Sequence, residues 1–192
     1  MARPSQLVAL VLAAGSSRRF GSDKRLARLS DGRTLLAASF ENARNVFGDV
    51  RVVLRLEDEP SHLGLPTDGK VVRSTRSGEG MGHSLAAGVR AVLDSNALAI
   101  AVLLGDMPRI DSTTLRALAR LSTANIIVVP SQNGKRGHPV IFGRDFWPEL
   151  LVLQGDTGAR DVLLRHPHHV IEVAVPDAGI HLDIDHPDRL EQ

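Results

Sequence analysis

The sequence of 192 residues contains no cysteine. This absence excludes disulfide bonds, thiolate zinc sites and a cysteine nucleophile, and it is typical of a protein from a reducing compartment. Long hydrophobic runs are also lacking, because the apolar stretches have the length of a strand and fall far short of a membrane span. The formal net charge is only +1, which predicts neither a nucleic acid nor a membrane as partner. A site for an anion must therefore be built locally.

What is present is the composition of an ordinary globular protein, with 43% hydrophobic and 23% charged residues. Because the sequence has no repeats and no obvious linker, we predict a single domain over residues 1–192, folded around one hydrophobic core. The first apolar run leads into a glycine-containing loop and lacks a small-residue cleavage site, so we interpret it as a strand and not as a signal peptide. Together these features predict a cytoplasmic protein.

Apolar runs of strand length alternate along the chain with segments of helical periodicity. Such alternation predicts an α/β fold with a largely parallel sheet and helices on both faces. Active sites in such folds lie at the carboxyl ends of the strands. The strands are expected at 7–13, 50–56, 71–72, 97–104, 126–129, 140–142, 170–175 and 181–184, and the helices at 34–47, 84–93, after the N-cap Asp111, at 146–153 and at 159–164.

The first strand ends in a small, cationic loop, Leu12-Ala-Ala-Gly-Ser-Ser-Arg-Arg-Phe-Gly-Ser-Asp-Lys24. Gly15 and Gly21 allow a tight turn and a close approach to a ligand. Arg18 and Lys24 add cationic donors, and backbone amides combined with such groups are what a polyphosphate requires. The spacing fits neither a Walker loop nor the dinucleotide fingerprint. The alternative interpretation is a plain glycine-rich turn with solvated arginines.

Asp106 follows the most apolar predicted strand, in the sequence Gly-Asp-Met-Pro. Reactions of polyphosphates require Mg²⁺ to bridge the phosphate oxygens, and Mg²⁺ takes one or two carboxylates as ligands, so we predict that Asp106 binds Mg²⁺. Asp183 and Asp185 would share one face of a C-terminal strand, where like charges repel unless a cation lies between them. The pattern predicts one of these two as a further metal ligand without deciding between them. A turn aspartate and an exposed strand end are the alternative interpretations.

Three alternating glycines precede the helix predicted at 84–93, in the sequence Gly78-Glu-Gly-Met-Gly-His-Ser84. Such a loop exposes backbone donors and acceptors to a planar ligand, and the helix N-terminus adds unpaired N–H groups. The pattern therefore predicts a loop that contacts a planar ligand, with Ser84 as helix cap and hydrogen-bonding group. A flexible hinge is the alternative.

These motifs resemble the signature elements of the MobA-like NTP transferases, a family of nucleotidyltransferases related to molybdenum cofactor biosynthesis. The opening loop matches L-A-A-G-x-S-x-R-x-G-x-x-K, G-D-M-P resembles the metal-binding element, and G-x-G-M-G-x-S-L resembles the segment for the nucleobase and ribose. The resemblance implies a Rossmann-like, three-layer α/β/α fold of the GT-A type with a mostly parallel mixed sheet. It implies Arg18, Lys24 and Asp106 as catalytic residues, and as nucleotide-binding residues Leu12, Ala13, Ala14, Gly15, Ser16, Ser17, Arg18, Lys24, Gly80, Gly82 and Ser84.

Two further segments resemble the branch of cytidylyltransferases that act on molybdopterin-type cofactors. They are Arg136-Gly-His-Pro-Val-Ile-Phe142 and Gly155-Asp-Thr-Gly-Ala-Arg160. Ala14 is typical of the members that transfer cytidine, since L-A-G-G is associated with guanosine transfer. The acceptor-binding residues implied in this way are Arg136, His138, Asp156 and Arg160, for which turn and cap chemistry is the alternative interpretation.

The resemblance implies a Mg²⁺-dependent transfer of CMP from CTP to the terminal phosphate of a molybdopterin-type cofactor, with release of pyrophosphate. A transient contact with a molybdoenzyme or its chaperone would follow. The alternatives are a guanylyltransferase or other nucleotidyltransferase with a different phosphorylated acceptor, and a non-catalytic chaperone that binds the molybdenum cofactor. A nicotinamide-dependent reductase ranks last, because the dinucleotide fingerprint is missing. Two features depart from the family pattern: Arg25 stands where many relatives are apolar, and residues 57–70 match nothing useful.

Overall fold

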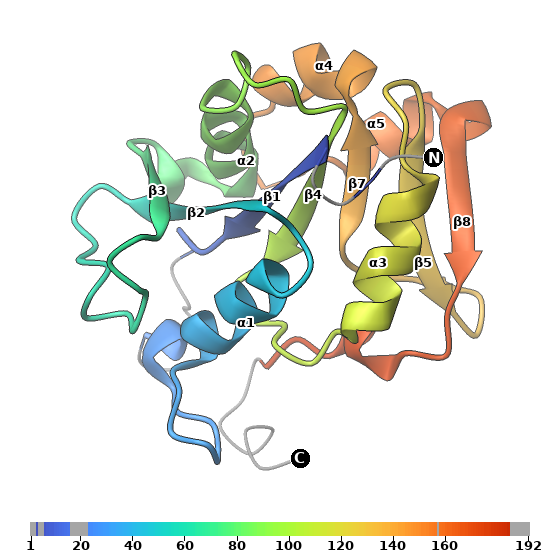
Figure 1. Ribbon diagram of the computed structural model, residues 1–192. Coiled ribbons are helices and arrows are strands. Elements are labelled where there is room, and N and C mark those ends of the chain that lie inside the picture. Colours follow the sequence, from blue (N-terminus) through green and yellow to red (C-terminus); the bar gives the residue numbers. More distant parts are fainter. Residues whose placement is uncertain (1–2, 4–5, 16–22, 157, 185–192) are drawn as a thin grey trace.

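The computed structural model describes residues 3, 6–15, 23–156 and 158–184 (Figure 1). Within these residues, one mixed sheet has the strand order β3-β2-β1-β4-β7-β5-β6, and β8 pairs with β5. The pairs β1–β2, β1–β4, β2–β3 and β5–β8 are parallel, whereas β7 and β6 run antiparallel to their neighbours. The strands are β1 (Leu7–Leu12), β2 (Asp49–Arg55), β3 (Lys70–Ser74), β4 (Ala99–Leu104), β5 (Ile127–Gln132), β6 (Lys135–Arg136), β7 (Val140–Gly143) and β8 (Val170–Ala174).

Helices cover both faces of the sheet, as the sequence predicts (Figure 1). They are α1 (Leu35–Arg44), α2 (Met81–Arg90), α3 (Ser112–Leu121), α4 (Trp147–Leu151) and α5 (Arg160–Arg165). Alternate side chains of β1 point to opposite faces. Leu7 and Val11 pack in one hydrophobic cluster with α1 and α3, and Val8 and Leu10 pack in the other with α2, α4 and α5. Each fully buried leucine or valine stabilises the fold by about 1.5–3 kcal/mol, so the two clusters hold three layers together.

The strand predicted at 181–184 is wrong. His181 ends a 3-10 turn, Ala178–His181, in which the buried Asp177 accepts a hydrogen bond from the Gly179 amide at 2.8 Å, and residues 182–184 continue without regular secondary structure. Helix α2 begins three residues earlier than predicted, since Gly80 turns the chain at a φ of 123° directly before it. No helix of the described residues is long and apolar enough to cross a membrane.

The ends of β1 and β4 place two predicted loops side by side. Leu12 pairs with Leu104 in parallel register, and the Gly105 amide donates to the Leu12 carbonyl at 2.9 Å. A Cβ at position 105 would lie 2.9 Å from the Leu36 side chain and 3.0 Å from that of Ala13, so a larger residue would force the neighbouring side chains to shift where the two loops leave the sheet. Asp106 therefore lies next to the end of β1.

Candidate active site

Lys24 and Asp106 meet at this edge of the sheet. The Lys24 ammonium donates to the Asp106 carboxylate across 2.5 Å, and each side chain is 18% exposed. Lys24 opens a short 3-10 helix, Lys24–Leu26, whose N-cap is Asp23. That helix is tied to the start of α1, because the Leu35 amide donates to the Ala27 carbonyl at 2.8 Å. The pair offers a cation and a carboxylate within one contact, both within reach of a ligand.

The C-terminal segment reaches the same loop. The Ile184 amide donates to the Asp106 carbonyl at 3.2 Å, so the chain that carries the half-buried Asp183 runs past the backbone of the predicted metal ligand. Within the described residues, His and carboxylate side chains form no group of three that could hold a metal. A site of one or two carboxylates suits Mg²⁺ or Mn²⁺, which complete their coordination with water and substrate phosphates. The donor set therefore fits the predicted ion.

His138 also lies at this edge. Its backbone amide donates to the Ile180 carbonyl at 2.9 Å, and its buried Nδ1 has no hydrogen-bond partner among the described residues. Burial lowers the pKa of His138, and the negative charge of Asp106 opposes that shift without overcoming it. The imidazole is therefore a neutral group near Asp106 and adds no positive charge to the site.

The two glycine loops of the sequence pack against each other. The Gly82 amide donates to the Gly155 carbonyl at 2.8 Å, and a Cβ at Gly80 would lie 2.3 Å from the Gly155 carbonyl carbon. The glycines at 80 and 82 thus permit a backbone contact with residues 154–156, which the sequence did not reveal. Ser84 is buried, with its hydroxyl 3.5 Å from that of Ser74, so its predicted contact with a nucleotide stays a prediction.

The remaining predicted residues fall into three groups. Arg136 donates to Glu172 of β8 at 2.8 Å, whereas Asp156 and Arg160 are exposed next to the glycine loops. Leu12, Ala13 and Ala14 are buried and Gly15 is exposed, so the opening loop leaves the core at Gly15. Outside the described residues lie Ser16, Ser17, Arg18 and Asp185.

The carbonyl groups of the opening loop are bound by arginines that the sequence motifs did not predict. Arg25 donates to the Ala13 carbonyl at 2.8 Å, and Arg55 donates to the carbonyls of Ala14 and Gly15. A long-range contact of this kind leaves no periodic signal in the sequence. The departure of Arg25 from the family pattern was the only available hint.

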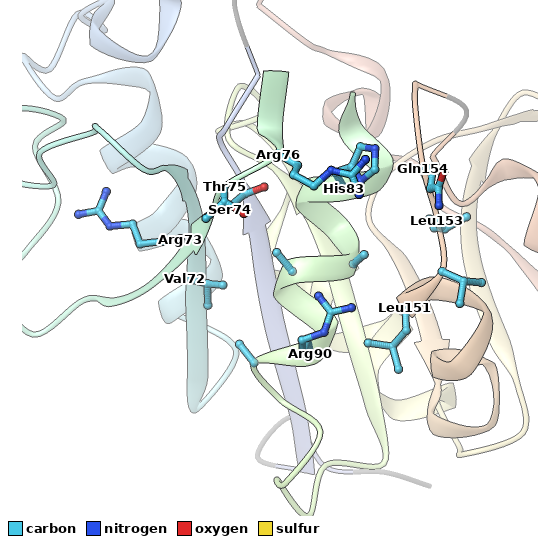
Figure 2. Close-up of a pocket in the computed structure, with 14 residues that line it drawn as sticks. Val72, Arg73, Ser74, Thr75, Arg76, His83, Arg90, Leu151, Leu153 and Gln154 are labelled. Atoms are coloured by element: carbon cyan, nitrogen blue, oxygen red, sulfur yellow. The ribbon is translucent and has the colours of Figure 1, made fainter. Parts of the chain in front are cut away.

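A groove with a volume of about 570 Å³ crosses the outer side of α2, between β3 and residues 151–154 (Figure 2). Its lining includes His83 and the cationic side chains of Arg73, Arg76 and Arg90, of which Arg76 is bound to Glu79 at 2.6 Å. The groove is lined by neither Lys24 nor Asp106. We place the candidate site at the Lys24–Asp106 contact and not in this groove, because the residues predicted to bind phosphate and metal meet there, at the carboxyl ends of β1 and β4.

Known proteins are similar to the chain along most of its length. Over 170 residues it is 32% identical to the purine catabolism protein PucB of Bacillus subtilis, in an alignment that covers 84% of this chain and 82% of that protein. Over 186 residues it is 26% identical to the molybdenum cofactor cytidylyltransferase of Escherichia coli, with 96% of this chain and 93% of that protein covered. The second similarity is long enough to include both loops that meet at Lys24 and Asp106.

Solved structures share the fold. The crystal structure of Rv0371c from Mycobacterium tuberculosis is 31% identical with a TM-score of 0.80, covering 96% of both chains. A complex of Rv0371c with manganese has a TM-score of 0.73 at 30% identity, covering 89% of both chains. The MobA-like NTP transferase domain matches residues 9–170, from the first strand to the start of the last. The chain therefore belongs to the MobA-like NTP transferase family of nucleotidyltransferases.

Proposed function

We propose that the chain transfers CMP from CTP to the terminal phosphate of a molybdopterin-type cofactor in a Mg²⁺-dependent reaction that releases pyrophosphate. The observation that carries this proposal is the contact of Lys24 with Asp106 where β1 and β4 end. Ala14 and the Arg136–Phe142 segment support cytidine transfer, as does the similarity to a cytidylyltransferase along 96% of this chain. The cytoplasm remains the proposed location.

The proposed reaction needs charge neutralisation and alignment rather than a protein nucleophile. An oxygen of the acceptor phosphate forms a bond to the α-phosphorus of CTP. The bond from that phosphorus to the oxygen that bridges the α- and β-phosphates breaks, and pyrophosphate leaves. Lys24 and Arg18 would balance the charge that develops on the leaving group. Asp106, with Asp183 or Asp185, would hold Mg²⁺. The metal, when bound, neutralises phosphate oxygens of the nucleotide.

Lys24 and Asp106 neutralise each other in this structure. On substrate binding, Lys24 would turn its ammonium to a phosphate oxygen and Asp106 would hold the divalent ion, so that their mutual contact would be replaced. The neutral His138 lies near Asp106 and would supply a hydrogen bond to the acceptor without repelling the metal. Arg136, Asp156 and Arg160 are proposed to bind the acceptor further out.

A scan of the four nucleoside triphosphates tests the proposal. Purified protein is incubated with molybdopterin cofactor, Mg²⁺ and each triphosphate, and pyrophosphate release is measured together with the melting temperature of the protein–nucleotide mixture. CTP is expected to give the fastest release and the largest increase in melting temperature. Faster release with GTP would overturn the choice of cytosine.

The same assay separates catalysis from cofactor transport. A chaperone would bind the molybdopterin cofactor tightly and release no pyrophosphate with any triphosphate. That result would overturn the proposed transfer reaction, whereas release that depends on cofactor, CTP and Mg²⁺ together would support it.

A further inference from the structure

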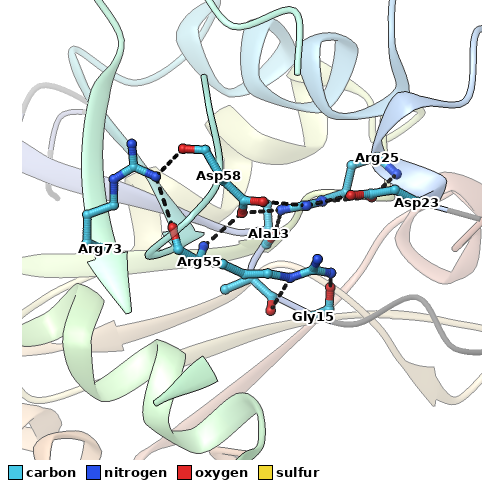
Figure 3. Close-up of polar contacts among 8 residues, drawn as sticks. Ala13, Gly15, Asp23, Arg25, Arg55, Asp58 and Arg73 are labelled. Carbon is cyan, nitrogen blue, oxygen red and sulfur yellow. Dashed lines mark hydrogen bonds and ion pairs between the residues drawn. The ribbon is translucent and has the colours of Figure 1, made fainter. Parts of the chain in front are cut away.

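Arg25 is a buried guanidinium, with only 5% of the residue exposed. All five of its N–H donors have acceptors. Nε and Nη2 donate to Asp23 at 2.8 and 2.5 Å, and Nη1 and Nη2 donate to Asp58 at 2.5 and 2.7 Å. The remaining Nη1 donor binds the Ala13 carbonyl at 2.8 Å (Figure 3). Such a fully satisfied fork fixes the relative positions of three separate backbone segments.

Asp58 is itself anchored in the connection between β2 and β3. Its carboxylate accepts from the Arg55 amide at 2.8 Å, and its backbone carbonyl accepts from Arg73 of β3 at 2.5 Å (Figure 3). Burial raises the pKa of Asp58, but the hydrogen bonds from Arg25 and from the Arg55 backbone outweigh burial and bring the pKa below its ordinary value. Asp58 is therefore an ionised, rigidly held anchor for Arg25.

Both ends of the opening loop depend on this network. On one side, Arg25 and Arg55 bind the carbonyls of residues 13–15. On the other side, Asp23 caps the short helix that begins with Lys24. Carbonyl oxygens carry partial negative charge and repel phosphate. The guanidinium groups of Arg25 and Arg55 bind three of these oxygens and hold them in a fixed direction. Lys24 lies between Asp23 and Arg25, which bind each other, and its ammonium contacts Asp106.

We propose that Arg25, acting through Asp23 and Asp58, is a positioning residue that fixes both ends of the phosphate-binding loop and thereby holds Lys24 against Asp106. The consequence for nucleotide affinity rests on the proposed function, whereas the effect on Lys24 does not. Arg25 touches no reacting atom in this proposal. The network also gives residues 57–70 a role through Asp58.

The chain contains a matched control in Asp31 and Arg33. Arg33 repeats the arrangement, since its backbone amide, Nε and Nη2 donate to Asp31 at 3.0, 2.9 and 2.5 Å and Nη1 donates to Glu41 at 2.6 Å. Its side chain is 46% exposed, in contrast with the buried Arg25. Arg33→Met thus removes the same charge and the same number of carboxylate partners without touching residues 13–15.

The first experiment compares full-length wild type with Arg25→Met, Arg25→Lys, Asp58→Asn and Arg33→Met, with no nucleotide present. The rate at which a limiting acylating reagent modifies the Lys24 amine is measured by peptide mapping under conditions where each variant is folded. We expect Arg25→Met to raise that rate about tenfold, because a displaced ammonium loses its carboxylate partner. Asp58→Asn should raise it less, and Arg33→Met should leave it unchanged.

The second experiment measures binding of pyrophosphate and of CTP, each with Mg²⁺, by titration calorimetry. Arg25→Met should weaken both by about tenfold or more, and Arg25→Lys should recover part of the loss. An unchanged Lys24 rate in folded Arg25→Met, or equal effects of Arg25→Met and Arg33→Met, would overturn the positioning role. If Arg25→Met does not fold, Asp58→Asn carries the same comparison. Wild type that binds neither ligand would overturn the proposed function, while the modification rates still decide the role of Arg25.

Discussion

The amide of Gly82 donates a hydrogen bond to the carbonyl of Gly155 across 2.8 Å. The first residue belongs to the loop predicted to bind the nucleotide, and the second belongs to the segment predicted to bind the acceptor. In a transferase the two substrates must meet within one reaction distance, so a direct contact between their loops is a way to fix that distance. Any change that separates the loops should affect both substrates.

Gly80→Ala tests this contact. The Cβ would lie 2.3 Å from the Gly155 carbonyl carbon, and the backbone has a φ of 123°, which alanine rarely adopts. We expect a loss of about 1–3 kcal/mol in the free energy of unfolding, measured by urea denaturation. Gly78→Ala is the control, because a Cβ there meets nothing within 4 Å and its φ lies outside the left-handed region. Equal stabilities of the two variants would contradict the close approach to Gly155 as the reason for the glycine.

Lys24→Ala should lower the rate of pyrophosphate release by orders of magnitude while the fold remains intact. The ammonium is proposed to neutralise charge on the leaving group, and the Asp106 carboxylate that remains keeps contact with solvent, since its side chain is 18% exposed. Lys135→Ala removes an exposed lysine from β6 and should leave the rate unchanged. A wild-type rate in Lys24→Ala would remove this residue from the mechanism.

Asp106→Asn should weaken Mn²⁺ binding in the presence of CTP by about tenfold or more, as measured by electron paramagnetic resonance of the free ion. The substitution keeps the shape of the side chain and removes its charge. Asp183→Asn and Asp185→Asn are measured beside it, and the larger loss of the two identifies the second ligand. Asp94→Asn, in the turn between α2 and β4, is the control for a general loss of negative charge. If Asp106→Asn binds Mn²⁺ as wild type does, the predicted metal site is wrong.

Much of the fold could be predicted from periodicity, because buried strands and amphipathic helices impose repeating patterns on the sequence. The run at 97–104 corresponds to β4 at Ala99–Leu104, and the predicted sheet with helices on both faces is confirmed. The strand predicted at 181–184 failed for a local reason. A single buried Asp177 closes a turn there, and one hydrogen-bonding side chain outweighs a short apolar alternation.

The part of the candidate site that could be predicted is the part built from motifs at the ends of strands. Lys24 and Asp106 meet because β1 and β4 are parallel neighbours, and Gly15 and Gly105 mark in the sequence where these two strands end. The burial of Arg25 and the contact of Gly80 with Gly155 were not predictable. Each depends on a partner tens of residues away, and neither partner leaves a mark at a fixed spacing.

Acid should weaken the fold through Asp23 and Asp58. Burial raises the pKa of each, but hydrogen bonds from Arg25 outweigh it, so both folded-state values lie below the ordinary value. The unfolded chain, with a carboxyl pKa of about 3.9, then binds protons more readily than the folded chain. The stabilising contribution is therefore complete above about pH 5 and is lost as the pH falls from there through the folded-state pKa values. Urea unfolding of wild type between about pH 6 and about pH 2.5 measures this slope.

Asp58→Asn supplies the comparison that assigns the slope. The amide keeps the side-chain shape but gives up the charge facing Arg25 and Arg55, so we expect a loss of about 1–3 kcal/mol at neutral pH and a shallower fall in acid. Asp31→Asn removes the corresponding carboxylate of the exposed Arg33 pair, where solvent screens the charge, and should change neither quantity appreciably. The same acid slope in Asp58→Asn and wild type would mean that other carboxylates cause it. In that case Asp58 is not the ionised anchor that the hydrogen bonds of Arg25 indicate.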